Sequence, residues 1–210
     1  MNIFVSGIDT DAGKTYATAW LARQLARKGR RVVTMKFLQT GCTGSSEDIE
    51  AHRRLTGTGL LPEDAEGLTA PIIFSYPASA QLAARIDGRE IDLTLIDNAM
   101  AELARRYDDV LIEGAGGLMV PITDEFMSID YVAGRHLPVA LVTNSKLGSI
   151  NHTLLSLEAL DNRHIPLQYL LYNEHSYGAG PEIEADTRAY LQRRLAARYP
   201  AATFLPVPEY

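Results

Sequence analysis

The nine residues GIDTDAGKT, at positions 7–15, constrain the fold of this chain more than any other segment. A short apolar run over residues 2–6 precedes them, and apolar residues at helical spacing follow until Gly29. A glycine-rich turn ending in Gly-Lys-Thr between a strand and a helix is typical of a phosphate-binding loop, because its backbone N–H groups point at a bound anion. The usual loop has four residues between its glycines. Here Gly7 and Gly13 are separated by five.

Strand-like and helix-like patterns alternate along the rest of the chain. Apolar runs predict strands at residues 31–37, 108–122, 137–143 and 166–172, and helical spacing predicts helices at 49–55, 93–107, 150–162 and 182–198. Residues 57–90 show no clear period and are expected to be irregular. The alternation predicts an α/β fold with a mostly parallel β-sheet and helices on both faces, like that of P-loop NTPases. Ligands then bind at the carboxyl edge of the sheet.

Composition narrows the function classes. A chain of 210 residues, 46% apolar and 22% charged, suits one globular domain over residues 1–210. A net charge of −6 argues against a nucleic-acid partner. No window approaches the roughly 18 apolar residues of a membrane helix, and the strand beginning at residue 2 leaves no signal peptide before it. The single cysteine, Cys42, fits a reducing compartment, so we expect a cytoplasmic protein without a membrane.

The loop itself separates several nucleotide-binding classes. Lys14 is placed to reach the outer phosphates, and the Thr15 hydroxyl is placed to bind Mg²⁺. Partitioning-type ATPases place a second lysine next to the first glycine of the loop, whereas Asp9 stands there in this chain. The segment TNSKLG, residues 143–148, lacks the aspartate that GTPases use to read their base. Both classes are therefore disfavoured.

Four segments occur in an order that resembles the ATP-dependent dethiobiotin synthetase family. They are GIDTDAGKT, KFLQTG from Lys36, EGAGG from Glu113 and KLGSINH from Lys146. Any one of them is a weak signal, but the combination is specific, and the similarity runs from residue 2 to about residue 208. The resemblance implies a ligase that carboxylates 7,8-diaminopelargonate with CO₂ and MgATP. One amine forms a carbamate, the γ-phosphate activates it as a carbamic-phosphoric anhydride, and the second amine closes the ring to dethiobiotin.

The resemblance also assigns roles to particular residues. It implies catalytic roles for Thr10, Lys14 and Lys36, in a reaction that needs positive charge and positioning rather than a protein nucleophile. A magnesium ion would be held by Thr15, Asp48 and Glu113. Without the resemblance, the interpretation of Asp48 as a helix N-cap is equally good. A carboxylate that ends a buried run, as Glu113 does, is poorly explained by packing.

Larger sets follow from the same resemblance. The implied ATP-binding residues are Asp11, Ala12, Gly13, Lys14, Thr15, Tyr16, Asp48, Glu113, Gly114, Ala115, Gly116, Asn173 and Val207. The implied substrate-binding residues are Thr40, Gly117, Asn151, His152 and Tyr190. The KLGSINH region of the family meets a two-fold-related subunit, so a homodimer with its substrate site at the interface is expected.

The chain departs from the family pattern in several places. Phe37 stands where a proline usually follows the catalytic lysine, and Asp11 replaces a longer glutamate. The stretch PASA, residues 77–80, lacks a second proline, and relatives often continue beyond residue 210 with residues around the purine. The nucleotide preference is therefore less well determined than the phosphate site.

Two other functions fit parts of the sequence. Related amide synthetases of corrin synthesis carry a glutaminase domain, for which 210 residues leave no room. A nucleotide-dependent regulatory switch would respond to a protein partner, and Asp9 and the lack of an amphipathic membrane-binding tail argue against it. ATP turnover that requires both bicarbonate and the diamine distinguishes the ligase from the switch.

Overall fold

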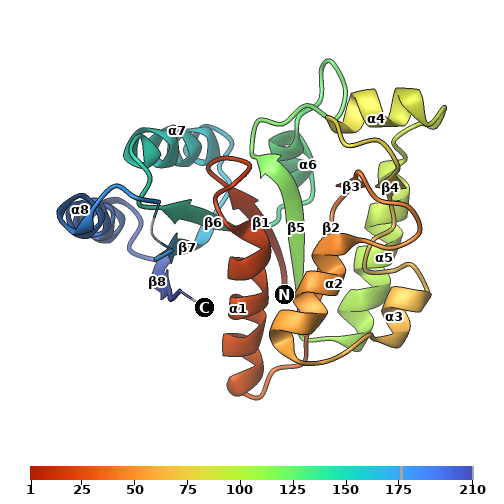
Figure 1. Ribbon diagram of the computed structural model, residues 1–210, viewed down its shortest axis with the longest axis horizontal. Coiled ribbons are helices and arrows are strands. Elements are labelled where there is room, and N and C mark those ends of the chain that lie inside the picture. Colours follow the sequence, from red (N-terminus) through yellow and green to blue (C-terminus); the bar gives the residue numbers. More distant parts are fainter. Residues whose placement is uncertain (176, 210) are drawn as a thin grey trace.

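The computed structural model describes residues 1–175 and 177–209. Within these residues, six strands form one sheet in the order β2-β5-β1-β6-β7-β8 (Figure 1). Their bounds are β1 Asn2–Gly7, β2 Val32–Lys36, β5 Asp109–Gly117, β6 Val139–Asn144, β7 Leu167–Asn173 and β8 Thr203–Val207. Every neighbouring pair in this sheet is parallel, as the alternating sequence pattern predicted.

Helices cover both faces of the sheet. On one face α1 (Lys14–Arg27) packs Leu21 and Leu25 against a cluster that includes Val5. The next residue toward the N-terminus, Phe4, points to the opposite face, because side chains alternate along a strand. That face is covered by α5 (Leu93–Arg106), α6 (Ser128–Gly134), α7 (Ser149–Asn162) and α8 (Pro181–Arg198). Strands buried on both faces read as continuous apolar runs, which is why the sequence reveals them.

The ends of two helices follow from their capping residues. The Asp92 side chain accepts a hydrogen bond from the Thr94 N–H and caps α5. The Ser46 hydroxyl accepts from the Ile49 N–H at 3.2 Å and caps α2 (Glu47–Thr56). Asp48 lies in the first turn of α2, so the interpretation of this residue as the N-cap is wrong and its carboxylate is available for other contacts.

Residues 57–90 are more ordered than the sequence predicted. They contain α3 (Pro62–Ala65), β4 (Ile73–Phe74) and α4 (Ala80–Ile86), and β4 pairs in parallel with β3 (Gln39–Thr40). The sequence also gave no prediction of α6 or β8. Elements this short hold too few residues for a periodic pattern to stand out, and tertiary contacts fix them instead.

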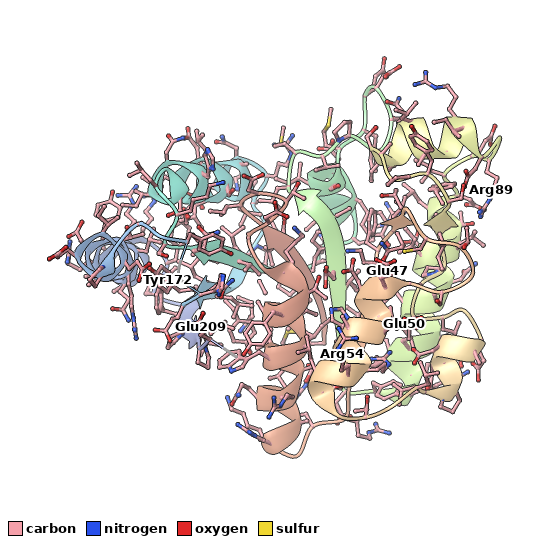
Figure 2. All side chains as sticks on the ribbon, in the orientation of Figure 1. Glu47, Glu50, Arg54, Arg89, Tyr172 and Glu209 are labelled. Carbon is pink, nitrogen blue, oxygen red and sulfur yellow. The ribbon has the colours of Figure 1, made fainter. Side chains whose placement is uncertain are left out.

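The register of the sheet brings particular residues together at its carboxyl edge. Lys36, the last residue of β2, lies opposite Glu113 on β5, and Val5 of β1 lies opposite Glu113 on the other side. Helix α2 lies beside α1, in front of these strand ends (Figure 1). Its exposed face carries Glu47, Glu50 and Arg54, which point away from the sheet (Figure 2). The opposite face of α2 is therefore the one that meets the strand ends.

No helix among the residues described is long and apolar enough to cross a membrane.

Candidate functional site

The loop between β1 and α1 depends on one glycine. Gly13 has a φ of 87° and stands at the N-cap of α1, in a left-handed conformation that glycine adopts without strain. A Cβ at this position would also overlap the amide nitrogen of Asn173. Both conditions require glycine at the residue that turns the loop into the helix, so that the first N–H groups of α1 face the space above the loop.

Lys14 is held over the loop. Its Nζ donates hydrogen bonds to the carbonyls of Asp9 at 3.2 Å and Thr10 at 2.9 Å, and the side chain is buried. Burial lowers the pKa of Lys14, the nearby charge of Lys36 lowers it further, and the Glu113 carboxylate opposes this shift. Two ammonium groups therefore lie close enough to repel each other, which is the arrangement that two lysines acting on one anion require.

Thr15, Asp48, Glu113 and Lys36 form a second set of contacts beside the loop. The Thr15 hydroxyl lies 2.9 Å from Asp48 Oδ1 and 3.0 Å from Glu113 Oε1, and it donates to one of them. Lys36 Nζ donates to Glu113 Oε1 at 3.0 Å and forms an ion pair with Asp48. Four residues that are far apart in sequence thus meet at one place.

The charges in this set stabilise one another. Glu113 is only 1% exposed and Lys36 only 5% exposed. Burial opposes both charges, but Lys36 and His52 hold the pKa of Glu113 well below its usual range. In the same way burial works against the Lys36 ammonium, yet Glu113 and Asp48 raise the pKa of Lys36. Both groups are therefore ionised at neutral pH.

The oxygen atoms of this set suit a small divalent cation. Mg²⁺ is held in proteins by one or two carboxylates, with hydroxyl, water and phosphate oxygens completing its coordination. Asp48, Glu113 and Thr15 supply that type of donor, with the Thr15 hydroxyl within hydrogen-bonding distance of both carboxylates. No group of three or more His, Cys, Asp or Glu side chains in the described part of the chain is arranged to hold a metal. These three donors would leave the remaining coordination positions of a cation to water or other oxygens.

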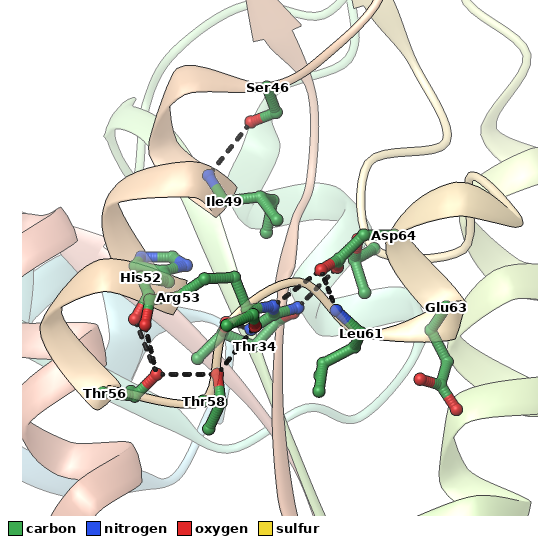
Figure 3. Close-up of polar contacts among 12 residues, drawn as sticks. Thr34, Ser46, Ile49, His52, Arg53, Thr56, Thr58, Leu61, Glu63 and Asp64 are labelled. Atoms are coloured by element: carbon green, nitrogen blue, oxygen red, sulfur yellow. Dashed lines mark hydrogen bonds and ion pairs between the residues drawn. The ribbon is translucent and has the colours of Figure 1, made fainter.

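Helix α2 also supplies a residue that the sequence analysis missed. His52, which is completely buried, places Nε2 2.7 Å from Glu113 Oε2. On the adjoining side of the helix, Arg53 forms paired hydrogen bonds to Asp64 and donates to the Thr34 hydroxyl (Figure 3). A histidine four residues after Asp48 on a helix lies on the same face, and that spacing is the only sequence signal that could have identified it.

Among the cavities that open beside the loop, two are lined by most of the predicted site residues. Cavity A, of about 550 Å³, is lined by Thr10, Asp11, Gly13, Lys14, Thr15, Tyr16, Lys36, Leu38, Gln39, Thr40, Asp48, Glu113, Ala115 and Gly116. Cavity B, of about 380 Å³, shares Thr10 and is lined also by Ile8, Asp9, Gly117, Leu118, Met119, Val120, His152, Leu155, Ser156 and Ala159. Most of the predicted site residues thus face one of two cavities that meet at Thr10. Gln39 and Leu38 were not predicted to line the site.

Other predicted site residues lie outside these two cavities. Asn151 is exposed on the first turn of α7, and Tyr190 on α8 packs against the larger hydrophobic cluster. Ala12 and Val207 are fully buried. Gly114 faces the ring of Phe4, which a Cβ at this position would overlap, so packing accounts for this glycine.

Asn173 is buried against the loop. Its Nδ2 donates to the Ala12 carbonyl at 3.2 Å and lies 3.3 Å from the Tyr177 hydroxyl, while its Oδ1 accepts from the His175 N–H. Tyr177 in turn donates to the Asp11 carbonyl at 3.0 Å. These contacts tie the end of β7 to the loop. The predicted role of Asn173 in reading adenine stays a prediction.

Solved structures of low sequence identity share this fold. A putative plasmid partition protein from Borrelia burgdorferi, bound to AMPPNP, aligns with a TM-score of 0.57 at 13% identity, over 100% of this chain and 86% of that one. A ParA family ATPase from Chlorobium tepidum aligns with a TM-score of 0.53 at 15% identity, over 97% and 84% of the two chains. At such identities the likeness concerns the P-loop fold alone.

Sequence comparisons identify the family. A family model described as an AAA domain matches residues 1–203. The ATP-dependent dethiobiotin synthetase BioD 2 of Pasteurella multocida is 44% identical over 96% of this chain and 94% of its own length. The ATP-dependent dethiobiotin synthetase BioD of Chlorobaculum tepidum is 48% identical over 91% and 80% of the two chains. Similarity of this extent shows that the chain, with the loop and the charged groups described above, belongs to the ATP-dependent dethiobiotin synthetase family, whose members are ligases that form carbon–nitrogen bonds.

Proposed function

We propose that this chain converts 7,8-diaminopelargonate, CO₂ and MgATP into dethiobiotin, ADP and phosphate. The names of its relatives support the overall reaction. The single observation that carries the proposal is that Lys14 and Lys36 line one cavity together with Thr15, Asp48 and Glu113. A reaction between a carbamate and a triphosphate gathers negative charge, and its main requirement is fixed positive charge and alignment.

The bond changes can be assigned to the substrates. One amine nitrogen attacks CO₂ and loses a proton, giving a carbamate. A carbamate oxygen attacks the γ-phosphorus and ADP leaves, which gives a carbamic-phosphoric anhydride. The second amine then attacks the carbamate carbon, the ring closes, and phosphate leaves. Atoms balance without any group bonded covalently to the protein.

The residues of cavity A fit the phosphate side of this reaction. The loop N–H groups and Lys14 bind the triphosphate, with Gly13 setting the start of the helix. Lys36 lines the same cavity, where it would stabilise the carbamate and the transferred phosphoryl group. Thr15, Asp48 and Glu113 would hold Mg²⁺, which supplies charge neutralisation for the phosphate oxygens when bound. Ala115 and Gly116 line the wall toward which the predicted nucleotide would extend.

Cavity B fits the organic substrate. Its apolar lining, which includes Ile8, Leu118 and Leu155, suits the hydrocarbon chain of a diamino acid. Thr10 belongs to both cavities, so a molecule in cavity B can present its amines to cavity A. Thr40 lines cavity A, whereas Gly117 and His152 line cavity B. We assign the substrate carboxylate to the KLGSINH helix start of a two-fold-related copy, together with Asn151 and Tyr190, in a cytoplasmic homodimer.

Product formation by the purified protein tests the proposal. With ATP, Mg²⁺, bicarbonate and the diamine, mass spectrometry should detect dethiobiotin, and omission of either bicarbonate or the diamine should abolish ATP turnover. Replacing Lys36 with methionine should lower kcat by about 10²- to 10³-fold, the usual cost of losing one charge-stabilising group. Lys28→Met, at the exposed end of α1, is the matched control and should keep full activity. ATP turnover that is independent of both co-substrates would refute the assignment.

A further inference from the structure

His52 is a buried polar side chain to which the proposed reaction gives no role. It lies on α2, four residues after Asp48, and none of its surface is exposed. Histidines are seldom buried to this extent, and a polar ring in such a position needs hydrogen-bond partners. The hydrogen-bond partners of the His52 ring therefore indicate the role of this side chain.

The ring makes one polar contact within the described residues. Nε2 lies 2.7 Å from Glu113 Oε2, while Nδ1 is buried with no hydrogen-bond partner in that part of the structure. Because an ionised carboxylate only accepts hydrogen bonds, Nε2 carries the hydrogen in this contact. The ring thus donates a hydrogen bond from Nε2 to Glu113 Oε2.

The two oxygens of Glu113 have different partners. Oε2 faces His52, whereas Oε1 faces Thr15 and Lys36, at 3.0 Å from each. Rotation of the carboxylate about its last bond would exchange or displace these contacts. A hydrogen bond to Oε2 therefore determines how Oε1 is presented to the cavity.

The helix that carries His52 is itself fixed. Arg53, the next residue, is bonded to both carboxylate oxygens of Asp64, at 2.9 and 2.7 Å, and to the Thr34 hydroxyl at 2.8 Å. Asp48 and His52 share the face of α2 that meets Glu113 and Lys36. A hydrogen-bond donor on an anchored helix is suited to hold a neighbouring carboxylate in one orientation.

We propose that His52 is a positioning residue, whose Nε2–H holds the Glu113 carboxylate so that Oε1 faces Thr15 and Lys36. The proposal deepens the proposed function, because Glu113 is one of the three residues assigned to the cation. Partners that orient a metal-binding carboxylate typically contribute 10- to 100-fold to metal affinity. His52 would therefore tune cation binding without touching the cation or the substrates.

A matched pair of amide variants tests this role. In His52→Gln the side-chain amide nitrogen can reach the place of Nε2 and keep the donor, whereas in His52→Asn it lies near the place of Nδ1 and the donor is lost. Ile96→Val, a fully buried position on α5, serves as a control for a loss of stability away from the site. If the asparagine variant does not fold, His52→Leu provides the same loss of the donor in an apolar side chain of similar volume.

Two measurements give the outcome. Crystal structures should retain the Oε1 contacts to Thr15 and Lys36 in His52→Gln and lack them in His52→Asn. The affinity for Mn²⁺ in the presence of a non-hydrolysable ATP analogue, measured by electron paramagnetic resonance, should fall about tenfold or more in His52→Asn and return toward the wild-type value in His52→Gln. Ile96→Val should leave both readouts unchanged.

The result can be separated from that of the proposed function, since neither measurement requires diamine, bicarbonate or product. A Glu113 carboxylate that keeps its orientation in His52→Asn would overturn the positioning role. Should Glu113→Gln bind Mn²⁺ as tightly as the wild type, the proposed cation site fails, and the crystal structures still decide the role of His52.

Discussion

Gly13 and Gly29 offer a direct comparison of two kinds of constraint on a single residue. Both have positive φ, 87° and 80°, so a side chain at either position meets the same backbone strain. They differ in surroundings: a Cβ at Gly29 meets nothing within 4 Å, while one at Gly13 overlaps the Asn173 amide. A substitution at Gly29 therefore reports backbone strain alone, whereas the same substitution at Gly13 reports backbone strain together with disturbance of the loop.

Alanine at these two positions should therefore have unequal effects. Gly29→Ala is expected to lower the free energy of unfolding by about 1 kcal/mol and to leave nucleotide affinity unchanged. Gly13→Ala should carry the same strain and in addition displace Asn173 and the start of α1, so nucleotide binding should fall by at least about tenfold. Isothermal titration calorimetry with ATP, together with thermal unfolding, measures both effects. Equal nucleotide affinity in the two variants would contradict this account.

Single residues also show how far sequence could predict the site. Lys14, Thr15, Lys36 and Glu113 were predicted because each belongs to a short motif, and all four line cavity A. His52 belongs to no motif, and its partner Glu113 lies 61 residues away in the sequence. A contact of that range depends on how α2 is docked, which the local pattern does not specify.

The docking of α2 depends on the pair between Arg53 and Asp64. Arg53 is 4% exposed, and its guanidinium group is bonded to Asp64 on α3 and to Thr34 on β2. Burial, the largest single influence, opposes the charge of Asp64, yet Arg53, the Leu61 N–H and the Thr69 hydroxyl lower its pKa below 3.8. The segment predicted to be irregular thus supplies the partner that holds a site-bearing helix.

The direction of this pKa shift gives a pH dependence. A carboxyl whose pKa is lower in the folded than in the unfolded state adds stability above the unfolded value of 3.8. That contribution is lost as the pH falls through the lower folded value. Asp64→Asn should therefore lower the free energy of unfolding by about 3 kcal/mol at neutral pH, because a buried guanidinium group loses its counter-charge. The difference between variant and wild type should shrink as the pH falls below 3.8.

Urea unfolding at a series of pH values measures the effect. Glu47→Gln, on the exposed face of the same helix, is the control and should change the free energy of unfolding by no more than about 0.5 kcal/mol. A constant difference between Asp64→Asn and wild type over the whole pH range would show that Asp64 is not held as the structure indicates.

The elements that sequence predicted share a physical property. Strands β1, β2, β5, β6 and β7 of the large sheet are mostly buried and the long helices have one apolar stripe, so both give local patterns. Strand β8 ends in Leu205-Pro206-Val207 and is only partly buried, while β3 and β4 have two residues each. Their formation depends on neighbours already in place, which no local pattern records. The expectation of a single domain over residues 1–210 stays a prediction.

At the scale of the whole molecule, exposed apolar side chains gather beside cavity B. Met119 is 54% exposed and Leu155 is 58% exposed, and both line that cavity. Leu147, in the turn before α7, is 82% exposed. Apolar residues that cluster at a cavity rim are typical of surfaces covered by a partner. The expected homodimer would cover them with a second copy of the chain.

A charge placed on this rim should prevent that association. In Leu155→Glu a carboxylate would be buried without a partner at the interface, which costs several kcal/mol, so the variant should sediment as a monomer where the wild type sediments as a dimer. Leu95→Glu is the control, because Leu95 is 43% exposed on α5, a helix that does not line cavity B. Sedimentation is the readout in Leu155→Glu, because Leu155 also lines the proposed substrate cavity and its replacement should lower dethiobiotin formation directly. Leu95→Glu should leave both the dimer and dethiobiotin formation unchanged. If Leu155→Glu remains dimeric, the two copies meet through another surface than this rim.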